Sequence, residues 1–149
     1  MAEREKKPVA MGRSWLNVLT TVPLLHGLSK RHLGRIADLA THQRFSAHTD
    51  IVRSGEPGSS FFVILDGTAT VRRTGRRAAK LGPGEFFGEM AVLDGAERTA
   101  TVTSDTDIEV MVIGRKDLLR LVETEPKLAV GMLTSMASRL RAAQSSASD

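Results

Sequence analysis

Short β-branched and aromatic segments alternate with glycine-containing turns between residues 51 and 90. The turns fall at residues 54–58, 66–67, 74–75 and 82–84. Glycine supplies the positive φ that tight corners require, and strands of about 4 to 8 residues between such turns are typical of an antiparallel sandwich or roll. Residues 100–114 add two more strands, with one apolar face made by Ile108, Val110 and Val112.

Helical patterns flank this β-rich region. One apolar stripe predicts a helix that ends at Pro23. The residues of this stripe are Trp15, Leu16, Leu19 and Val22. Ser29 is a suitable N-cap for a second helix over residues 30–40. Residues 115–125 are amphipathic, and Pro126 suits the first turn of a last helix. That last helix carries apolar residues at spacings of three and four: Leu133, Met136, Ala137 and Leu140.

The fold that we expect is therefore α+β and mainly β. It is an eight-stranded antiparallel β-roll, similar to a jelly roll, flanked by N-terminal helices and two C-terminal helices. Residues 13–143 form the domain, residues 1–12 form a charged disordered tail, and residues 144–149 form a frayed C-terminal tail.

Composition narrows the function classes. The chain has 149 residues, enough for one core, and no apolar run of the length that a membrane span needs. Its N-terminus is charged and lacks a secretory signal. The absence of cysteine excludes disulfides, thiolate metal sites and cysteine catalysis. We predict a cytoplasmic protein.

The segment FGEMAVLDGAERTATV, residues 87–102, carries the candidate chemistry. If a short helix follows Gly88, the N–H groups of Met90 and Ala91 are unpaired and form an anion site. Arg98, placed on the following strand, and the hydroxyl of Thr99 suit a phosphate. Glu89 accepts hydrogen bonds only, so a ribose hydroxyl is its natural donor. A sugar beside one phosphate charge describes a nucleotide.

These residues resemble the phosphate-binding cassette of cyclic nucleotide-binding domains, the family of catabolite activators, kinase regulatory subunits and cyclic-nucleotide-gated channels. Gly88-Glu89 and Arg98-Thr99-Ala100 match its core, and three glycines match its turns: Gly55, Gly67 and Gly82. The resemblance covers roughly residues 20–143 in element order.

The resemblance implies a non-catalytic sensor for cAMP, or for cGMP as the alternative, without a cofactor or a metal. It assigns the ribose 2′-hydroxyl to Glu89 and the cyclic phosphate to Arg98, Thr99 and the amides of Met90 and Ala91. The last helix would cover the base through Arg139, Ala143 and Gln144. Catabolite activators carry hydroxyl residues at the last two of these positions, so Ala143 and Gln144 depart from the pattern.

Other interpretations remain beside this one. Glu89 and Arg98 alone describe an ion pair that braces a loop, in a non-catalytic scaffold. A metalloenzyme of the cupin type needs clustered ligands, but no two of the four histidines are paired as H-x-H. A DNA-binding regulator needs a recognition helix after the lid helix, and the chain stops about nine residues beyond Leu140. The chain is then a stand-alone sensor or the regulatory piece of a longer protein.

Partners follow from the same features. We expect a protein effector, which the sequence does not identify, and a homodimer that forms through the C-terminal helix. We expect no contact with a membrane. The densest basic cluster surrounds the turn at residues 74–75: Arg72, Arg73, Arg76, Arg77 and Lys80. It is either a solvated loop or a docking patch for an acidic partner.

Overall fold

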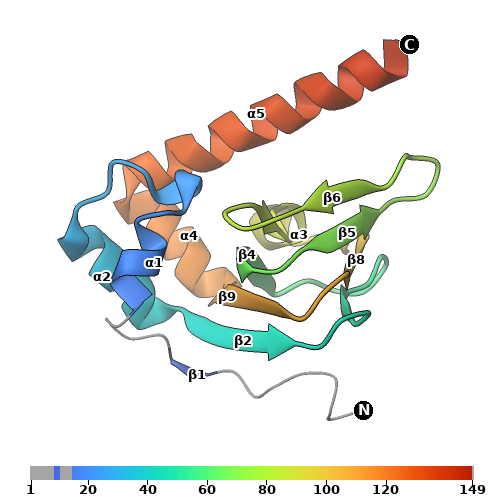
Figure 1. Cartoon of the computed structure of the whole chain (residues 1–149). Helices are drawn as coiled ribbons and strands as arrows, with labels where there is room; N and C mark the ends of the chain where they lie inside the picture. The colour runs from blue at the N-terminus through green and yellow to red at the C-terminus, as the bar shows by residue number, and fades with distance from the viewer. Residues whose placement is uncertain (1–8, 11–14, 149) are drawn as a thin grey trace.

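Two antiparallel sheets form the β-roll that the sequence predicts (Figure 1). The computed structural model describes residues 9–10 and 15–148. One sheet has the order β1-β2-β9-β4-β7 and the other has the order β3-β8-β5-β6. The strands are β1 (Val9–Ala10), β2 (Thr41–Phe45), β3 (Asp50–Val52), β4 (Ser60–Asp66), β5 (Ala69–Arg72), β6 (Ala79–Leu81), β7 (Phe86–Phe87), β8 (Thr101–Ser104) and β9 (Ile108–Gly114). Strands β2 to β9 are the expected eight.

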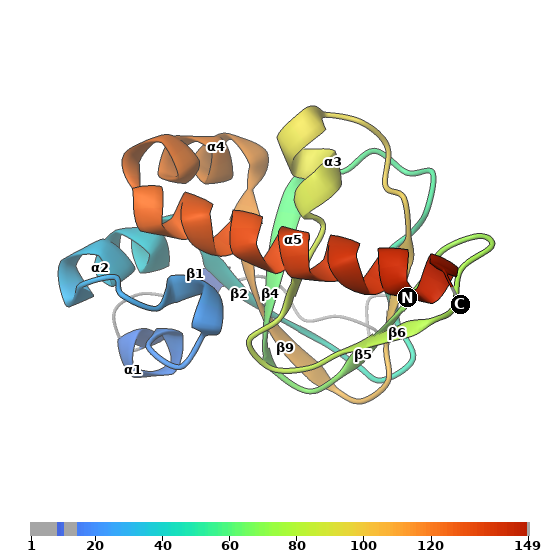
Figure 2. The ribbon, with the colours of Figure 1, turned by 90° about the horizontal axis from the view of Figure 1, so that it is seen from above.

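The helices gather at one end of the roll, except for α3 and the far part of α5. They are α1 (Leu16–Leu19), the 3-10 helix η3 (Pro23–Leu25), α2 (Lys30–Leu39), α3 (Glu89–Asp94), α4 (Arg115–Thr124) and α5 (Pro126–Ser148). Figure 2 shows α5 leaving this group and running across the roll toward the β5–β6 side. No helix in the described part of the chain is long and apolar enough to cross a bilayer.

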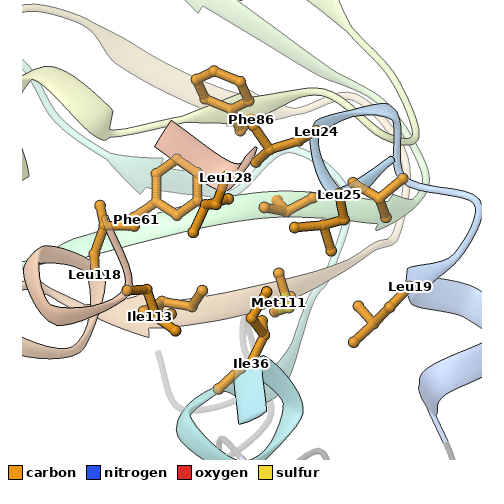
Figure 3. Packing of buried hydrophobic residues seen from close by; sticks show 14 of the residues in the cluster. Leu19, Leu24, Leu25, Ile36, Phe61, Phe86, Met111, Ile113, Leu118 and Leu128 are labelled. Atoms are coloured by element: carbon orange, nitrogen blue, oxygen red, sulfur yellow. The ribbon is translucent and has the colours of Figure 1, made fainter. Parts of the chain in front are cut away.

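Strand β4 is buried on both faces because it separates two cores. Phe61 and Val63 pack against the helices, whereas Phe62 and Ile64 point into the roll. Strand β9 alternates in the same way, with Met111 and Ile113 in the helical core (Figure 3). Its other face carries Ile108 and Val110, with Val112 packed beside them, as the sequence predicts. The alternation of strand side chains thus joins helices and roll into one unit.

The first predicted helix is shorter than its apolar stripe suggested. It ends at Leu19, and a 3-10 turn starts at Pro23. The hydroxyls of Thr20 and Thr21 donate to the carbonyls of Asn17 and Val18 at 2.6 Å, which offers the backbone an alternative to continuing the helix. The N-cap of α2 is confirmed, since Ser29 accepts from the N–H of His32 at 3.4 Å.

Both termini of the predicted domain differ in detail from the expectation. Most of the predicted tail, residues 1–12, lies outside the described residues, but Val9–Ala10 form β1 and pair with β2. Residues 144–148, predicted as a frayed tail, continue α5 as helix. The apolar residues predicted for this helix do not all face the core, because Leu133 and Leu140 are 65% and 60% exposed. Leu128 and Met132 supply the buried face instead.

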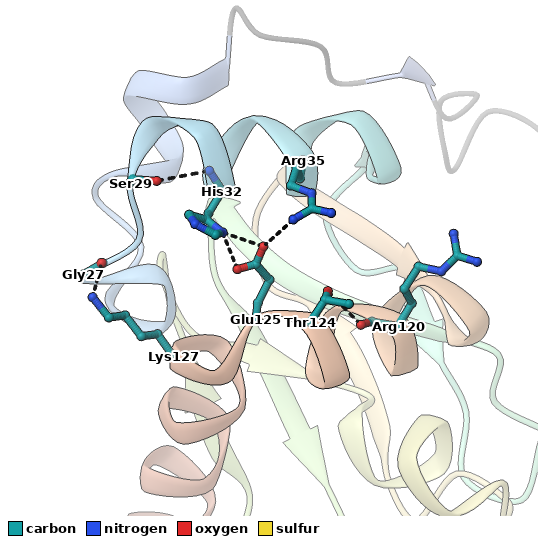
Figure 4. A network of polar contacts seen from close by, with 8 residues as sticks. All are labelled: Gly27, Ser29, His32, Arg35, Arg120, Thr124, Glu125 and Lys127. Atoms are coloured by element: carbon teal, nitrogen blue, oxygen red, sulfur yellow. Dashed lines mark hydrogen bonds and ion pairs between the residues drawn. The ribbon is translucent and has the colours of Figure 1, made fainter.

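Two close contacts fix the start of α5. A Cβ built on Gly131 would lie 2.7 Å from the carbonyl oxygen of Leu24, so α5 approaches η3 as near as glycine allows. The buried carboxylate of Glu125, at the junction of α4 and α5, binds His32 Nδ1 at 2.7 Å and lies 3.6 Å from Arg35 Nη1, both on α2 (Figure 4). The helix that crosses the roll is therefore anchored to the N-terminal helices at its base.

The contact at Gly131 reverses the usual effect of a helical substitution. Alanine in place of a helical glycine normally stabilises a protein by about 1 kcal/mol. We expect Gly131→Ala to lower the melting temperature instead, because the methyl group must displace the backbone at Leu24. Gly82→Ala is the control, since a Cβ there meets nothing within 4 Å. Thermal unfolding followed by circular dichroism checks this, and a gain for Gly131→Ala would contradict the packing described.

Candidate functional site

Helix α3 begins at a glycine that no other residue replaces easily. Gly88, its N-cap, has a φ of 87°, and a Cβ there would lie 2.7 Å from Nη1 of Arg98. The N–H of Val92 makes the first bond of the helix, to the carbonyl of Gly88 at 3.4 Å. The N–H groups of Met90 and Ala91 precede it, in the turn that has no acceptor within its own helix. This is the short helix that the sequence predicts.

Arg98 lies in the extended segment just before β8, and not on the strand as expected. Its N–H donates to the carbonyl of Glu56 at 2.8 Å, and the N–H of Gly55 donates to its carbonyl at 2.9 Å. The side chain is 8% exposed. Its Nη1 donates to the carbonyl of Gly88 at 3.2 Å and its Nη2 to that of Ser60 at 3.0 Å. Two backbone carbonyls therefore hold the guanidinium.

The surroundings of Arg98 leave its charge without a direct counter-charge. Burial lowers the pKa of Arg98, and the negative charges of Glu89 and Glu56 oppose this effect. The group stays protonated, as arginine does in proteins. No described carboxylate forms an ion pair with it, so the Glu89–Arg98 pair of the scaffold interpretation is not present. A buried cation whose neighbours are carbonyl dipoles is a strong attractor for an anion.

Glu89 is paired with α5 instead. The Glu89 side chain is 7% exposed, and its Oε1 accepts from Nη1 of Arg139 at 3.1 Å. The other end of the same guanidinium donates to the carbonyl of Phe86, and its Cζ lies 4.4 Å from the centre of the Phe86 ring. Arg139 thus connects α5 to both α3 and β7, through a charge pair, a hydrogen bond and a cation–π contact.

An open cavity of about 820 Å³ lies between α3, the second sheet and α5. Its volume is within the range of about 300 to 1,000 Å³ typical of ligand sites. Nine of the ten predicted site residues line it: Gly88, Glu89, Met90, Ala91, Arg98, Thr99, Ala100, Arg139 and Ala143. The tenth, Gln144, is exposed and is not part of the cavity wall.

Sequence reasoning missed several members of the site. A Cβ on Gly58 would lie 2.7 Å from Nε of Arg98, so this glycine makes room for the guanidinium. Gly58 was visible only as one of several turn glycines. Ser60 contributes a carbonyl, for which the sequence carries no signal, and Phe86 reads as an ordinary core residue. Among the described side chains, no group of three His, Asp or Glu is placed to hold a metal ion.

Comparison with known proteins agrees with the fold. The profile of the cyclic nucleotide-binding domain matches residues 42–125. A cAMP-dependent protein kinase regulatory subunit of Hypocrea atroviridis is 32% identical over 113 residues, which are 76% of this chain and 24% of that protein.

Two crystal structures share the architecture. The catabolite activator protein of Thermus thermophilus has a TM-score of 0.75 at 30% identity, covering 85% of this chain and 62% of that one. The regulatory domain of Toxoplasma gondii PKA, solved with cAMP, has a TM-score of 0.73 at 28% identity, covering 85% and 50%.

The chain thus spans about a quarter of the kinase subunit and less than two thirds of the activator. What is shared is the roll with its flanking helices. Since the profile matches more than half of the chain, the chain belongs to the cyclic nucleotide-binding domain family, as a single domain of that kind.

Proposed function

We propose that the chain is a regulatory module that binds cAMP and, without catalysis, passes the state of its site to a protein effector. The observation that carries this proposal is the guanidinium of Arg98, which is buried in the cavity wall, donates to the carbonyls of Gly88 and Ser60, and has no ion-pair partner among the described carboxylates. A cyclic phosphate supplies the missing negative charge. Glu89 lies on the same wall, where a ribose hydroxyl can donate to it.

The choice of cAMP over cGMP rests on the relatives. The Hypocrea subunit is named for its dependence on cAMP, and the Toxoplasma domain was solved with cAMP. The resemblance placed Gln144 among the residues that cover the base, but Gln144 does not line the cavity. Thr99 lines the cavity and serves either the phosphate or the base. A cytoplasmic location belongs to the same proposal.

Loss of Arg98 tests the phosphate site. Removing one member of a desolvated charge pair typically costs about 2 to 5 kcal/mol. We expect Arg98→Leu to weaken cAMP binding by at least about tenfold, measured by calorimetric titration, while circular dichroism shows an intact fold. The control is Arg120→Leu, which removes an exposed arginine of α4 and should bind as wild type does. A folded Arg98→Leu variant with unchanged affinity would place the phosphate elsewhere.

The sugar contact is tested at Glu89. Glu89→Gln keeps the shape but weakens a charge-assisted hydrogen bond to the 2′-hydroxyl. The substitution also weakens the ion pair with Arg139. Titration of cAMP alone therefore does not separate the contribution of the sugar contact from that of the ion pair. We therefore expect the variant to lose more affinity for cAMP than for 2′-deoxy-cAMP, which lacks that hydroxyl. Equal losses for the two ligands would show that Glu89 acts only through the lid helix.

The outer face of α5 supports a homodimer. Val130, Leu133 and Leu140 are 61%, 65% and 60% exposed, and with Ala137 they follow the 3-4-3 spacing of a coiled-coil seam. We propose that two copies pair along this seam, so that the helix that covers the cavity also forms the interface. Each chain would then present its cavity to the ligand independently of the seam.

Sedimentation equilibrium checks the dimer. Wild type should have twice the chain mass of 16.1 kDa. Leu133→Glu/Leu140→Glu should sediment as a monomer, because the charges repel each other across the seam. Ser138→Glu/Ser145→Glu, on exposed positions farther from the seam, should remain dimeric. A wild-type monomer at all concentrations would contradict the proposed interface.

A further inference from the structure

The β5–β6 hairpin contributes a second group of cations to the wall of the cavity. Arg73, Arg76, Arg77 and Lys80 line the same cavity as Arg98. All four hairpin residues are exposed, whereas Arg98 is 8% exposed. Figure 1 shows the hairpin extending past the other strands of its sheet. The cavity therefore has one buried cation and a separate cluster of cations at its solvent-exposed rim.

One of these rim cations is already neutralised. Nζ of Lys80 lies 3.0 Å from Oδ2 of Asp105, which also accepts from the hydroxyl of Thr70. Burial opposes ionisation of Asp105, but the hydrogen bonds from Thr70 and Lys80 and the charges of Lys80 and Arg72 hold its pKa below the ordinary value. Lys80 and Asp105 thus form a pair that needs no ligand.

The three arginines of the hairpin differ from Lys80. No carboxylate in the described part of the chain forms an ion pair with Arg73, Arg76 or Arg77. The two carboxylates of the cavity wall are engaged elsewhere, because Glu85 accepts from the N–H of Gly82 at 2.9 Å and Glu89 is held by Arg139. The hairpin arginines are an unneutralised positive group next to a nucleotide site.

A cyclic mononucleotide has a single negative charge, and Arg98 suffices for it. Three further guanidinium groups, each able to bind phosphate through two parallel hydrogen bonds, exceed what that ligand needs. We propose that the hairpin wall is a second anion subsite and that the cavity takes a nucleotide with two separated phosphate groups. One phosphate lies on Arg98, which rests on the function proposed above, and the other lies on Arg73, Arg76 and Arg77.

The strength of the second subsite follows from its exposure. Interactions between exposed charges are screened over about 10 Å at 0.1 M salt. Three exposed arginine–phosphate contacts together predict about tenfold tighter binding of the doubly charged ligand at low salt. The advantage should shrink to about twofold at 0.5 M salt, whereas binding at the buried Arg98 should change less.

The test compares cAMP with cyclic di-AMP, because both carry adenine and a free ribose 2′-hydroxyl but the second has two phosphodiesters. Both are titrated into the whole chain at low and high salt. We expect wild type to bind cyclic di-AMP about tenfold more tightly at low salt. Arg73→Gln/Arg76→Gln/Arg77→Gln should remove the difference. Arg31→Gln/Lys116→Gln/Arg120→Gln, which removes three exposed cations outside the cavity wall, should keep it.

The outcomes separate the two proposals. Equal affinities of wild type for both ligands would overturn the second subsite, and so would an equal loss for both in the hairpin variant, which indicates attraction of any anion. Hairpin-dependent binding of cyclic di-AMP without binding of cAMP would support the subsite and overturn the cAMP sensor. If neither ligand bound, both proposals would fall.

Discussion

The buried environment that holds the Arg98 guanidinium is the feature on which the rest of the site depends. Burying a charge is costly unless polar groups replace water around it. Here the replacement comes from the carbonyls of Gly88, just before α3, and of Ser60 on β4, and glycines at positions 58 and 88 leave the space. The roll therefore has to bring three chain segments together before the arginine can be held. A cation held in this way has polar partners but no opposite charge, which an anion would supply.

The second constraint is the path of α5. At its base the helix is fixed by the approach of Gly131 to Leu24 and by the carboxylate of Glu125 on His32. Farther along, Arg139 ties it to Glu89 in the wall of the cavity and to the carbonyl of Phe86 on β7. A ribose hydroxyl that binds Glu89 acts on the same carboxylate as the helix does. In the function proposed above, ligand binding and the position of α5 are thus coupled through the side chain of Glu89, which would give the module a physical route from its site to an effector.

Most of the fold could be predicted because its signals are local. Alternating apolar residues mark β4 and β9, and Ser29 and Pro126 mark helix starts where the structure has them. The threonine pair that shortens α1 was less visible, since its hydroxyls act on carbonyls only once the chain turns. The outward direction of Leu133 and Leu140 on α5 could not be predicted, because spacing identifies an apolar stripe but does not say which face meets the core.

The side chains that line the cavity could be predicted, but the ion pair between Glu89 and Arg139 could not. Residues 88–100 carry a local motif, so their convergence on one cavity was foreseeable. The partner of Glu89 is fifty positions away on another helix, and nothing in the spacing identifies it. The hairpin arginines read as a solvated loop or a docking patch because the sequence does not show that the hairpin forms the wall of the nucleotide cavity.

Calorimetric titration of the whole wild-type chain with cAMP tests the central claim most directly. Arg98 is a buried cation without an ion-pair partner among the described residues, and the carboxylate of Glu89 lies on the same cavity wall. This arrangement predicts saturable binding of one cAMP per chain. Under the same conditions adenosine, which carries no phosphate, should bind much more weakly. A folded chain that shows no saturable binding of cAMP, or that binds adenosine equally well, would contradict the account.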